Sequence, residues 1–517
     1  MTNQYKAGAI LSYATILIGN IAGLIYTPIM LRMLGQSEYG LYALVGSMIA
    51  TLSLVDLGFG NASIRYISKY RALGDQEKEY NVNGMFVIIN TVICFLTLVI
   101  GALLYFYLLN PLFGGSLSAS ELYQFKIMFA VLVFNLAVGF PFSVFGSILV
   151  SYERFAFPKI IGLVRTILNP IVILCVLYLG YKSLGMVIAN TVINLLFLWV
   201  NVYYCFKILK VKVYFKQFDW KLCKEIAVYS GFIFLAIIVD KIYWSTDQFI
   251  LGMFSGTTAV AVYAIASQFN MYYMQFSTAI SGMFLPRVTS MVVKDAGSRE
   301  LSELFIKIGR IQFLVLGLVL SGFVLFGKEF IGMWAGQEYT SSYLMAVLLI
   351  VPFTVPLIQN MGLTILQAKN LHGFRSTVYF LIALGNLGIS IPLAKAYGGV
   401  GCAAGTAISM IIGNIIIINI YYYKKIKLDI PRFWLEIGKI ALPLAAVAAV
   451  GAASNLWIAQ AGIGVFVAKT FFFVLVYGLV MYKFGMNAYE RALLASLFAR
   501  FFPRGKQMVS QTQGEGG

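Results

Sequence analysis

Three charged residues and a tryptophan interrupt a long apolar stretch near the middle of the chain. Within residues 226–251 the sequence places Asp240, Lys241, Trp244 and Asp247. In an α-helix Asp240, Trp244 and Asp247 share one face, because positions i, i+4 and i+7 are neighbours on the helix surface. Charges inside an apolar helix are costly and usually face a cavity or one another. The pattern predicts a polar stripe that binds a solute or exchanges a cation, or alternatively an ion pair that holds helices together.

A lone arginine lies inside another apolar stretch, residues 159–180. Arg165 is about two turns from the start of this stretch. Its planar guanidinium can pair with two oxygens of an anionic group, so Arg165 is a candidate anion contact. The alternative is that the long side chain reaches the headgroup layer of a membrane and acts as an anchor.

Composition explains why these charges stand out. Of 517 residues, 60% are hydrophobic and 11% are charged, whereas soluble domains are about a quarter charged. This predicts an all-α polytopic membrane protein with no soluble domain of any size. The net charge of +18 is spread between apolar stretches, which argues against a nucleic-acid-binding block.

Neither a metal site nor a cofactor is expected. The five cysteines form no CxxC pair, and His372 is the only histidine. A His-based catalytic triad or a zinc site would need more of these residues at closer spacing. The sequence contains no Walker A motif, so direct coupling of transport to ATP is not expected.

Fourteen apolar segments are long enough to cross a bilayer as helices, which takes about 20 residues each. If Lys6 is cytoplasmic, alternating spans leave most lysines and arginines in cytoplasmic loops, so the positive-inside rule predicts that both termini are cytoplasmic, N-in and C-in. The predicted spans are residues 9–31, 40–60, 84–109, 123–147, 159–180, 184–206, 226–251, 259–284, 308–326, 343–366, 374–394, 401–423, 437–458 and 463–482.

Spans one to six resemble spans seven to twelve. Tyr42 matches Tyr263 and Pro141 matches Pro356, in order and at a nearly constant offset. Because six is an even number, both copies begin on the same side, which predicts two parallel lobes around a central site. The alternative is the low-complexity similarity that apolar segments share. The predicted units are an N-lobe (1–222), a C-lobe (223–436), an appended helix pair (437–484) and a basic cytoplasmic tail (485–517).

Other residues mark possible moving parts. Pro141 and Pro356 lie inside spans four and ten, where each removes a backbone hydrogen bond, so they are candidate hinges or static kinks. Asp56 lies near the inner end of span two with Arg65 beyond it, which suggests a gate ion pair or simple solvation of a helix end. Arg32, at the outer end of span one, is a candidate phosphate contact or an interfacial anchor.

Two motifs carry a family resemblance that extends over essentially the whole chain. Residues 27–42 read TPIMLRMLGQSEYGLY and residues 56–60 read DLGFG, and both resemble the opening signature of the polysaccharide transporter family. That family belongs to the superfamily of multidrug, oligosaccharidyl-lipid and polysaccharide exporters. The resemblance implies a flippase, not an enzyme, in the bacterial cytoplasmic (inner) membrane. Its cargo would be an oligosaccharide on undecaprenyl diphosphate, such as an O-antigen unit, moved outward with an H⁺ or Na⁺ gradient.

Under this resemblance each candidate residue has an expected role. The implied partners are the lipid-linked oligosaccharide and membrane lipids, with a polymerase of the same pathway as a further candidate and no nucleic acid. The expected roles are diphosphate or sugar contact for Arg165, Lys241, Trp244 and Arg32, coupling or gating for Asp240, Asp247, Asp56 and Arg65, and hinge for Pro141 and Pro356.

Three alternative functions remain open at this stage. A flippase for lipid II, the peptidoglycan precursor, would share the fourteen-span plan. A cation-coupled drug exporter of the same superfamily would have twelve spans and no appended pair. A lipid-linked glycan polymerase or ligase would normally need a sizeable outer loop with paired catalytic residues, whereas the predicted outer loops here are short and carry few charges.

Overall fold

The computed structural model describes residues 2–215, 219–294, 297–369, 372–457 and 462–501. Within these ranges the chain is almost entirely helical and contains no strand. The helices are α1 (Thr2–Leu34), α2 (Gln36–Leu52), α3 (Phe59–Ala72), α4 (Gln76–Leu103), α5 (Leu109–Phe113), α6 (Ala119–Ser151), α7 (Ala156–Tyr178), α8 (Ser183–Tyr203), α9 (Trp220–Phe254), α10 (Gly256–Val293), α11 (Ser298–Trp334), α12 (Ser342–Ile358), α13 (Asn360–Ala368), α14 (His372–Met410), α15 (Ile418–Tyr421), α16 (Ile430–Trp457), α17 (Ile463–Val480) and α18 (Ala488–Phe501).

So apolar a sequence is expected to form helices, because a bilayer has no water to hydrogen-bond to backbone N–H and C=O groups. Polar residues at the helix ends fix where several helices begin. Ser118 and Glu121 form a reciprocal capping box at the start of α6. Asp75 accepts a hydrogen bond from the Lys78 amide at the start of α4, and Asp219 caps α9 in the same way.

The prediction of an all-α polytopic membrane protein is confirmed. Among the described residues, ten helices are long and apolar enough to cross a membrane, and the bent pair α12–α13 adds an eleventh. Apart from residue 458, which lies outside the described residues, each of the fourteen predicted spans falls on helical segments. Spans eleven and twelve both lie in the helical stretch 372–426, which Gly398, with a φ of 58°, divides into two arms. The number of helices that cross the membrane, the N-in/C-in orientation and the unit boundaries at 222, 436 and 484 stay predictions.

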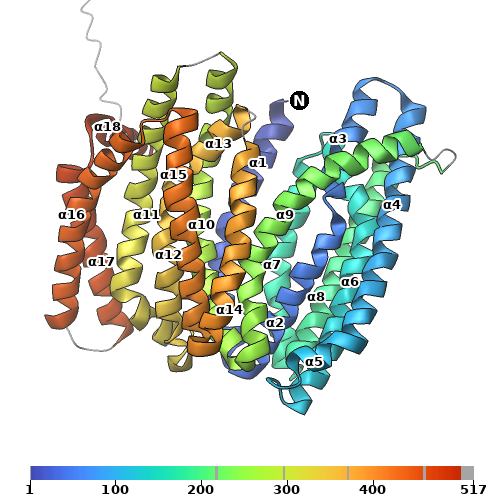
Figure 1. Ribbon diagram of the computed structural model, residues 1–517, viewed down its shortest axis with the longest axis horizontal. Helices are drawn as coiled ribbons and strands as arrows, with labels where there is room; N and C mark the ends of the chain where they lie inside the picture. Colours follow the sequence, from blue (N-terminus) through green and yellow to red (C-terminus); the bar gives the residue numbers. More distant parts are fainter. Residues whose placement is uncertain (1, 216–218, 295–296, 370–371, 458–461, 502–517) are drawn as a thin grey trace, which may run out of the picture.

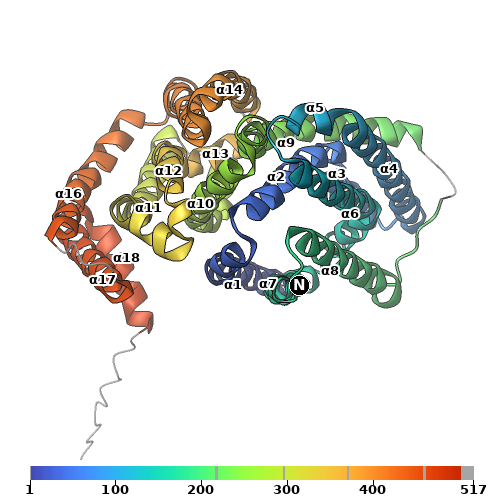
Figure 2. The ribbon, with the colours of Figure 1, turned by 90° about the horizontal axis from the view of Figure 1, so that it is seen from below.

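The helices gather into two halves with a smaller pair at one end (Figures 1 and 2). One half contains α1–α8, in which α1 packs on α7 and α4 packs on α6. The other contains α10–α15, and α9 leans across the first half, where it contacts α2 and α3, before it packs on α14. Helices α16 and α17 pack against each other and against α11 at the far end.

Several helices are broken rather than straight. Leu57 and Gly58 have left-handed backbone angles, with φ of 52° and 79°, and separate the end of α2 from α3. Helices α12 and α13 meet at a bend of 43° near Gln359, three residues after Pro356. Pro141, in contrast, lies within the uninterrupted helix α6. The two matching prolines therefore have different local structures, and a hinge role for either remains a prediction.

A buried arginine fastens the C-terminal part of the chain to the bundle. The Arg310 side chain, on α11, is only 4% exposed. Its Nε donates to Glu490 of α18 at 2.7 Å, its Nη1 donates to Glu436 of α16 at 2.9 Å, and its Nη2 donates to the carbonyl of Gly485. The part of the tail that the structure describes is therefore a docked helix, held to α11 and α16 by an ion-pair network.

Arg310→Met should lower the free energy of unfolding by roughly 3–5 kcal/mol, because it leaves the Glu490 carboxylate buried without a counter-charge. Thermal unfolding of the purified protein in detergent measures the change. The matched control is Arg299→Met on the same helix. Its ion pair with Glu303 is exposed, so the loss should stay below about 1 kcal/mol. Equal losses in the two variants would contradict the assigned role of Arg310.

Candidate functional site

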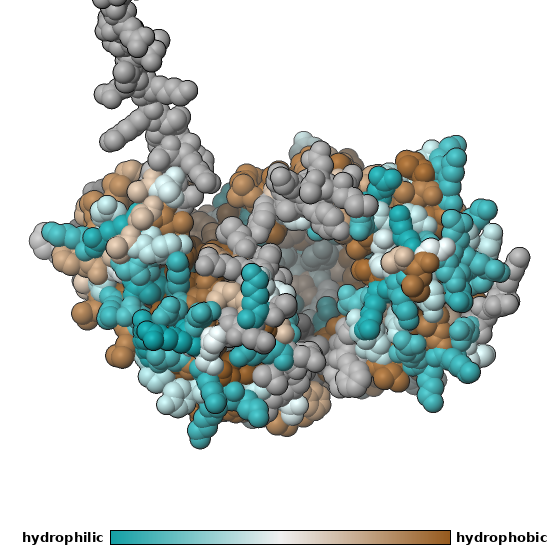
Figure 3. Space-filling model, turned by 90° about the horizontal axis from the view of Figure 1, so that it is seen from above, coloured by the Kyte–Doolittle hydropathy of each residue, from teal (hydrophilic) through white to brown (hydrophobic). Residues whose placement is uncertain are grey.

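The two halves are separated by a hollow on one face of the molecule. Figure 3 shows this hollow at the centre of the face seen from above, which is the face where α18 and the start of α1 lie in Figure 1. In the predicted N-in orientation this face is cytoplasmic. The opposite end of the bundle carries the α1–α2, α5–α6 and α9–α10 connections, and there the two halves touch.

A carboxylate organises the contact between the halves at that closed end. Glu121, in the first turn of α6, accepts hydrogen bonds from Ser37 of α2 at 2.6 Å and from Thr257 of α10 at 2.7 Å. Nearby, the hydroxyl of Ser116 donates to the carbonyl of Gly252 on α9 at 2.7 Å. Helices from both halves therefore meet through polar groups.

The backbones also approach closely at this end. A Cβ atom added to Gly40 of α2 would lie 1.9 Å from the carbonyl oxygen of Thr257, a distance that no side chain can accept. Glycine is required here because it lets α2 touch the first turn of α10. We call Ser37, Gly40, Ser116, Glu121 and Thr257 the interlobe seal.

Arg32 lies beside the seal rather than in the hollow. Its side chain is exposed, and its Nη2 is 3.5 Å from the carbonyl oxygen of Met333 at the end of α11. The neighbouring indole of Trp334 donates to the carbonyl of Leu24 on α1 at 2.7 Å. Arg32 thus sits where α1 meets α11, and its predicted phosphate contact is not tested by this arrangement.

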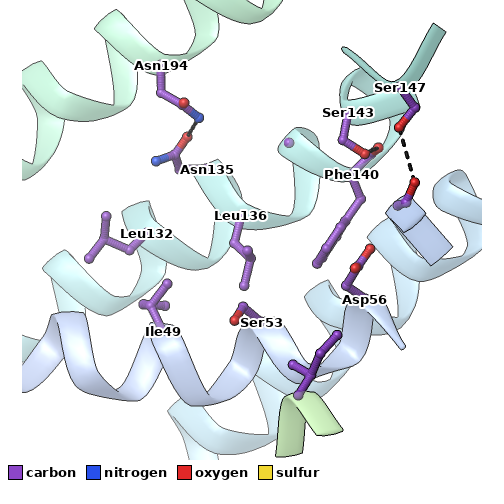
Figure 4. A pocket seen from close by; sticks show the side chains of 13 residues that line it. Ile49, Ser53, Asp56, Leu132, Asn135, Leu136, Phe140, Ser143, Ser147 and Asn194 are labelled. Atoms are coloured by element: carbon purple, nitrogen blue, oxygen red, sulfur yellow. Dashed lines mark hydrogen bonds between the residues drawn. The ribbon is translucent and has the colours of Figure 1, made fainter. Parts of the chain in front are cut away.

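The first half and α9 line an open, partly polar cavity of about 490 Å³ (Figure 4). Its polar walls come from three helices: Ser53 and Asp56 follow α2, Asn135 and Ser143 lie on α6, and Asn194 lies on α8. Asn194 donates a hydrogen bond to Asn135 at 2.8 Å. We call this the N-lobe cavity; its lining residues are Ile49, Ser53, Asp56, Gly60, Leu132, Asn135, Leu136, Gly139, Phe140, Ser143, Ser147, Asn194 and Ile237.

Asp56 is positioned by the break between α2 and α3. The left-handed residues Leu57 and Gly58 turn the chain back, so that the Asp56 carboxylate accepts backbone hydrogen bonds from Gly58 and Gly60. The predicted partner Arg65 lies elsewhere: its guanidinium is 4.4 Å from the ring centroid of Tyr229 on α9. Among the described residues Asp56 and Arg65 do not form an ion pair in this state.

The second half buries a carboxyl group in a polar cluster. Asp247 of α9 is 4% exposed, and its Oδ2 accepts hydrogen bonds from Tyr263 of α10 and from Thr406 of α14, the latter at 2.8 Å. Asn386 and Ser390, also on α14, hydrogen-bond to each other at 2.7 Å, and Asn386 lies 3.3 Å from the Thr406 hydroxyl. Asp247 Oδ1 has no hydrogen-bond partner among the described atoms. We call these five residues the C-lobe carboxyl site.

The other candidate residues are not brought together by any contact that the structure describes. Arg165 is exposed on α7 and forms no ion pair within the described part of the chain. Trp244 packs edge-to-face on Phe353 of α12, with ring centroids 5.4 Å apart. Lys241 is half-buried on α9, and the side chain of Asp240 lies outside the described residues. Their predicted roles in cargo binding and coupling remain untested.

The amides that build both sites are not among the residues predicted from the sequence. Asn135, Asn194 and Asn386 lie in the middle of predicted spans four, six and eleven. Uncharged amides inside an apolar helix are a weaker signal than charges, yet they too usually face a partner or a cavity. Asparagines in the middle of predicted spans are therefore the sequence signal that indicates both the N-lobe cavity and the C-lobe carboxyl site.

Comparison with known proteins decides the family. The model of the polysaccharide biosynthesis protein family matches residues 5–292, more than half of the chain. The chain belongs to the polysaccharide biosynthesis protein family. This confirms the resemblance that the motifs at residues 27–42 and 56–60 indicated.

Two relatives of this chain come from Haloferax volcanii. The probable low-salt glycan biosynthesis flippase Agl15 is 25% identical over 211 residues, which are 40% of this chain and 44% of the relative. The probable flippase AglR is 26% identical over 179 residues, 34% of this chain and 37% of the relative. The matches thus span less than half the length of either relative.

Solved structures establish the fold of the family member. The lipid II flippase MurJ, in an inward closed conformation, superposes with a TM-score of 0.73 over 96% of this chain and 99% of that one, at 17% identity. An inward-facing transporter of the multidrug resistance MATE family gives a TM-score of 0.61 over 78% and 92%, at 16% identity. At these identities the likeness shows a shared fold and nothing of the cargo.

The interlobe seal should open during activity, and a disulfide across it should prevent this. The Ser37 and Thr257 hydroxyl oxygens are 3.4 Å apart, which suits a Ser37→Cys/Thr257→Cys crosslink. In a background without the five natural cysteines, we expect oxidation to link the pair, to abolish activity almost completely, and to be reversed by reductant. Mass spectrometry of the linked peptides and an activity assay are the readouts, with each single cysteine as control. Undiminished activity of the crosslinked protein would show that the seal stays shut while the protein works.

Proposed function

We propose that this protein is a flippase that moves a lipid-linked oligosaccharide from the cytoplasmic to the outer leaflet by alternating access. The observation that carries the proposal is a hollow between two halves that is open on one face and closed at the other by the interlobe seal, in a member of the polysaccharide biosynthesis protein family. A passage that is open on one side and shut on the other is what a carrier of membrane-impermeant cargo requires.

The chemistry of such a cargo explains the architecture. A polyprenyl tail can stay in the bilayer, but hydroxyl-rich sugars and a charged diphosphate are too costly to bury in hydrocarbon without partners. The protein must replace their hydration while the lipid tail remains outside the bundle. A hollow between two lobes provides that environment, and rocking of the lobes about it would present the cargo to each leaflet in turn.

We assign the cargo as an oligosaccharide on undecaprenyl diphosphate, of the kind used for O-antigen or a similar surface glycan, in a bacterial cytoplasmic membrane. The names of the two Haloferax relatives, both flippases and one of glycan biosynthesis, support a glycan as the cargo, while the undecaprenyl carrier and the bacterial membrane follow from the family resemblance. Surrounding membrane lipids are necessary partners. A polymerase that consumes the flipped unit is a further expected partner in the same pathway.

Arg165, Lys241, Trp244 and Arg32 are our candidates for contact with the diphosphate and sugars. Arg165 suits the diphosphate because its guanidinium is exposed and no described acidic group competes for it. Trp244 is partly exposed beside Phe353 and presents an aromatic surface on which a sugar ring can stack. Arg32, at the closed end, would meet the cargo only after the seal has opened.

Coupling to a cation gradient is assigned to the C-lobe carboxyl site. A buried carboxyl group with one unpartnered oxygen is expensive unless it holds a proton or a cation. The oxygens of Asp247, Asn386 and Thr406 are the hard ligands that H⁺ or Na⁺ prefers. The site joins α9, α10 and both arms of α14 on either side of Gly398, so loss of its cation would change the packing of four helical segments at once.

A lipid II flippase is the second candidate function. Its support is the superposition on MurJ over nearly the full length of both chains. At 17% identity this shows a shared fold and carries no information on the cargo. Complementation separates the two: we expect this gene to restore surface glycan in a strain without its own glycan flippase. Rescue of a strain depleted of its lipid II flippase, without rescue of surface glycan, would favour the second candidate.

Arg165→Ala should reduce glycan export about tenfold or more while membrane levels of the protein stay near normal, because a charge-assisted contact to the diphosphate is lost. Arg165→Lys should keep partial activity, since the charge remains but the bidentate fork does not. Surface glycan in a strain without its own flippase is the readout. Arg154→Ala, an exposed arginine between α6 and α7, serves as the control. Export by Arg165→Ala at the wild-type rate would show that Arg165 is only a membrane anchor.

Asp247→Asn should remove the dependence of export on the cation gradient, because the amide keeps the hydrogen bonds of Tyr263 and Thr406 but cannot exchange a cation. Flux measured in vesicles with and without an imposed H⁺ or Na⁺ gradient tests this. Asp219→Asn is the matched control, since asparagine caps α9 as well as aspartate does. If Asp247→Asn responds to the gradient as the wild type does, coupling lies elsewhere.

A further inference from the structure

The N-lobe cavity contains hydrogen-bonding groups that the protein leaves unused. Asn194 donates to Asn135, which leaves the amide nitrogen of Asn135 and the amide oxygen of Asn194 without partners among the described residues. Whichever way the two amides are oriented, the pair presents one free donor beside one free acceptor. Figure 4 shows these residues at one end of the cavity, with Asp56 and Phe140 at the other.

Hydroxyl groups extend this polar surface. Ser53 and Ser143 donate to carbonyls of their own helices, those of Ala50 and Phe140, each at 2.7 Å. Their oxygens remain free to accept a further hydrogen bond. Phe140 adds an aromatic ring that points into the space between them. Amides, hydroxyls and one ring face are the groups that bind the hydroxyls and the apolar face of a sugar.

Charge indicates which part of the cargo can enter. Among the lining residues that the structure describes there is no lysine or arginine, and the one charged residue is Asp56. A diphosphate or an acidic sugar would meet a like charge there without a compensating cation, whereas a neutral sugar can hydrogen-bond to the carboxylate. The volume of about 490 Å³ is in the range of small-molecule sites.

We propose that the N-lobe cavity is a sugar subsite that binds a neutral sugar of the cargo through Asn135, Asn194 and Asp56 and so helps to select which glycan is moved. This rests on the proposed flippase function and adds to it the chemical class that the cavity recognises. One wall comes from Ile237 of α9, the helix that runs on into the other half. A sugar in the subsite therefore also contacts α9, the helix that connects the two halves.

The test compares two probes on the purified full-length protein in nanodiscs: undecaprenyl diphosphate alone, and undecaprenyl diphosphate carrying a neutral oligosaccharide. We expect the wild type to bind the glycosylated probe about tenfold more tightly, the effect of two or so net hydrogen bonds. Asn135→Leu and Asn194→Leu should lose this preference and keep the wild-type affinity for the bare lipid diphosphate. That unchanged affinity also shows that the variants are folded.

Asn190→Leu is the matched control. Asn190 lies one turn before Asn194 on α8 and hydrogen-bonds to Tyr42 rather than lining the cavity, so its variant should keep the preference. If the wild type prefers the glycosylated probe and Asn135→Leu and Asn194→Leu do too, the subsite is wrong and the flippase stands. Equal wild-type affinity for both probes also overturns the subsite. A wild type that binds neither probe contradicts the proposed function itself.

A third probe, whose oligosaccharide carries a uronic acid, tests the role of charge. The wild type should bind it more weakly than the neutral probe, and Asp56→Asn should narrow that difference by removing the like charge. Binding should be the same in sodium and in choline salts. If Asp56→Asn instead abolishes a sodium dependence and leaves the sugar preference intact, the cavity is a cation site and the proposal is overturned.

Discussion

The absence of water in the hydrocarbon core is the constraint on which the rest of this structure depends. It forces the backbone into helices and requires each buried polar side chain to find a partner or a cavity. Arg310 meets this requirement with two carboxylates and a carbonyl, and Asp247 meets it with two hydroxyls. Polar groups that line a cavity without a protein partner, such as the free sides of Asn135 and Asn194, mark where a ligand can bind.

The same constraint makes the two ends of the bundle different. At the closed end, Glu121 satisfies hydroxyl groups from both halves, and Gly40 lets two backbones touch. Water can replace the partners of these polar groups when the halves separate, but opening must also part the apolar contact between α2 and α10, in which Leu44 and Ile265 are fully buried. At the other face a hollow keeps the halves apart. The closed end can therefore open without burying an unpaired polar group, because each hydrogen bond of the interlobe seal can be exchanged for one to water.

Much of the fold could be predicted because each helix is specified by its own apolar length. The predicted spans coincide with helices, and the motif at residues 27–42 led to the family that the comparison confirms. The docking of α18 could not be predicted, since Arg310, near the start of the predicted span 308–326, and Glu490, in the predicted tail, are far apart in the sequence. Distance along the chain conceals a contact even where both residues are conspicuous.

The sites were predictable only in part, for related reasons. Asp247 stood out as a charge in an apolar stretch, but its neighbours Asn386 and Thr406 come from a helix far along the chain. Asp56 was predicted to pair with Arg65, but the Arg65 guanidinium stacks on Tyr229 instead. The left-handed turn at Leu57 and Gly58 directs the Asp56 carboxylate back to α3. Backbone breaks of this kind leave little trace in composition or periodicity.

Direct observation of lipid movement tests the central claim, that this chain carries a lipid-linked glycan across the bilayer. The purified protein would be reconstituted into liposomes with a labelled undecaprenyl-diphosphate-linked oligosaccharide in both leaflets, and a glycosidase that cannot cross the membrane would be added outside. The account predicts that the glycosidase eventually digests nearly all of the glycan in protein-containing vesicles, and only the outer-leaflet share in protein-free vesicles. Digestion that stops at the outer-leaflet share in both would contradict it.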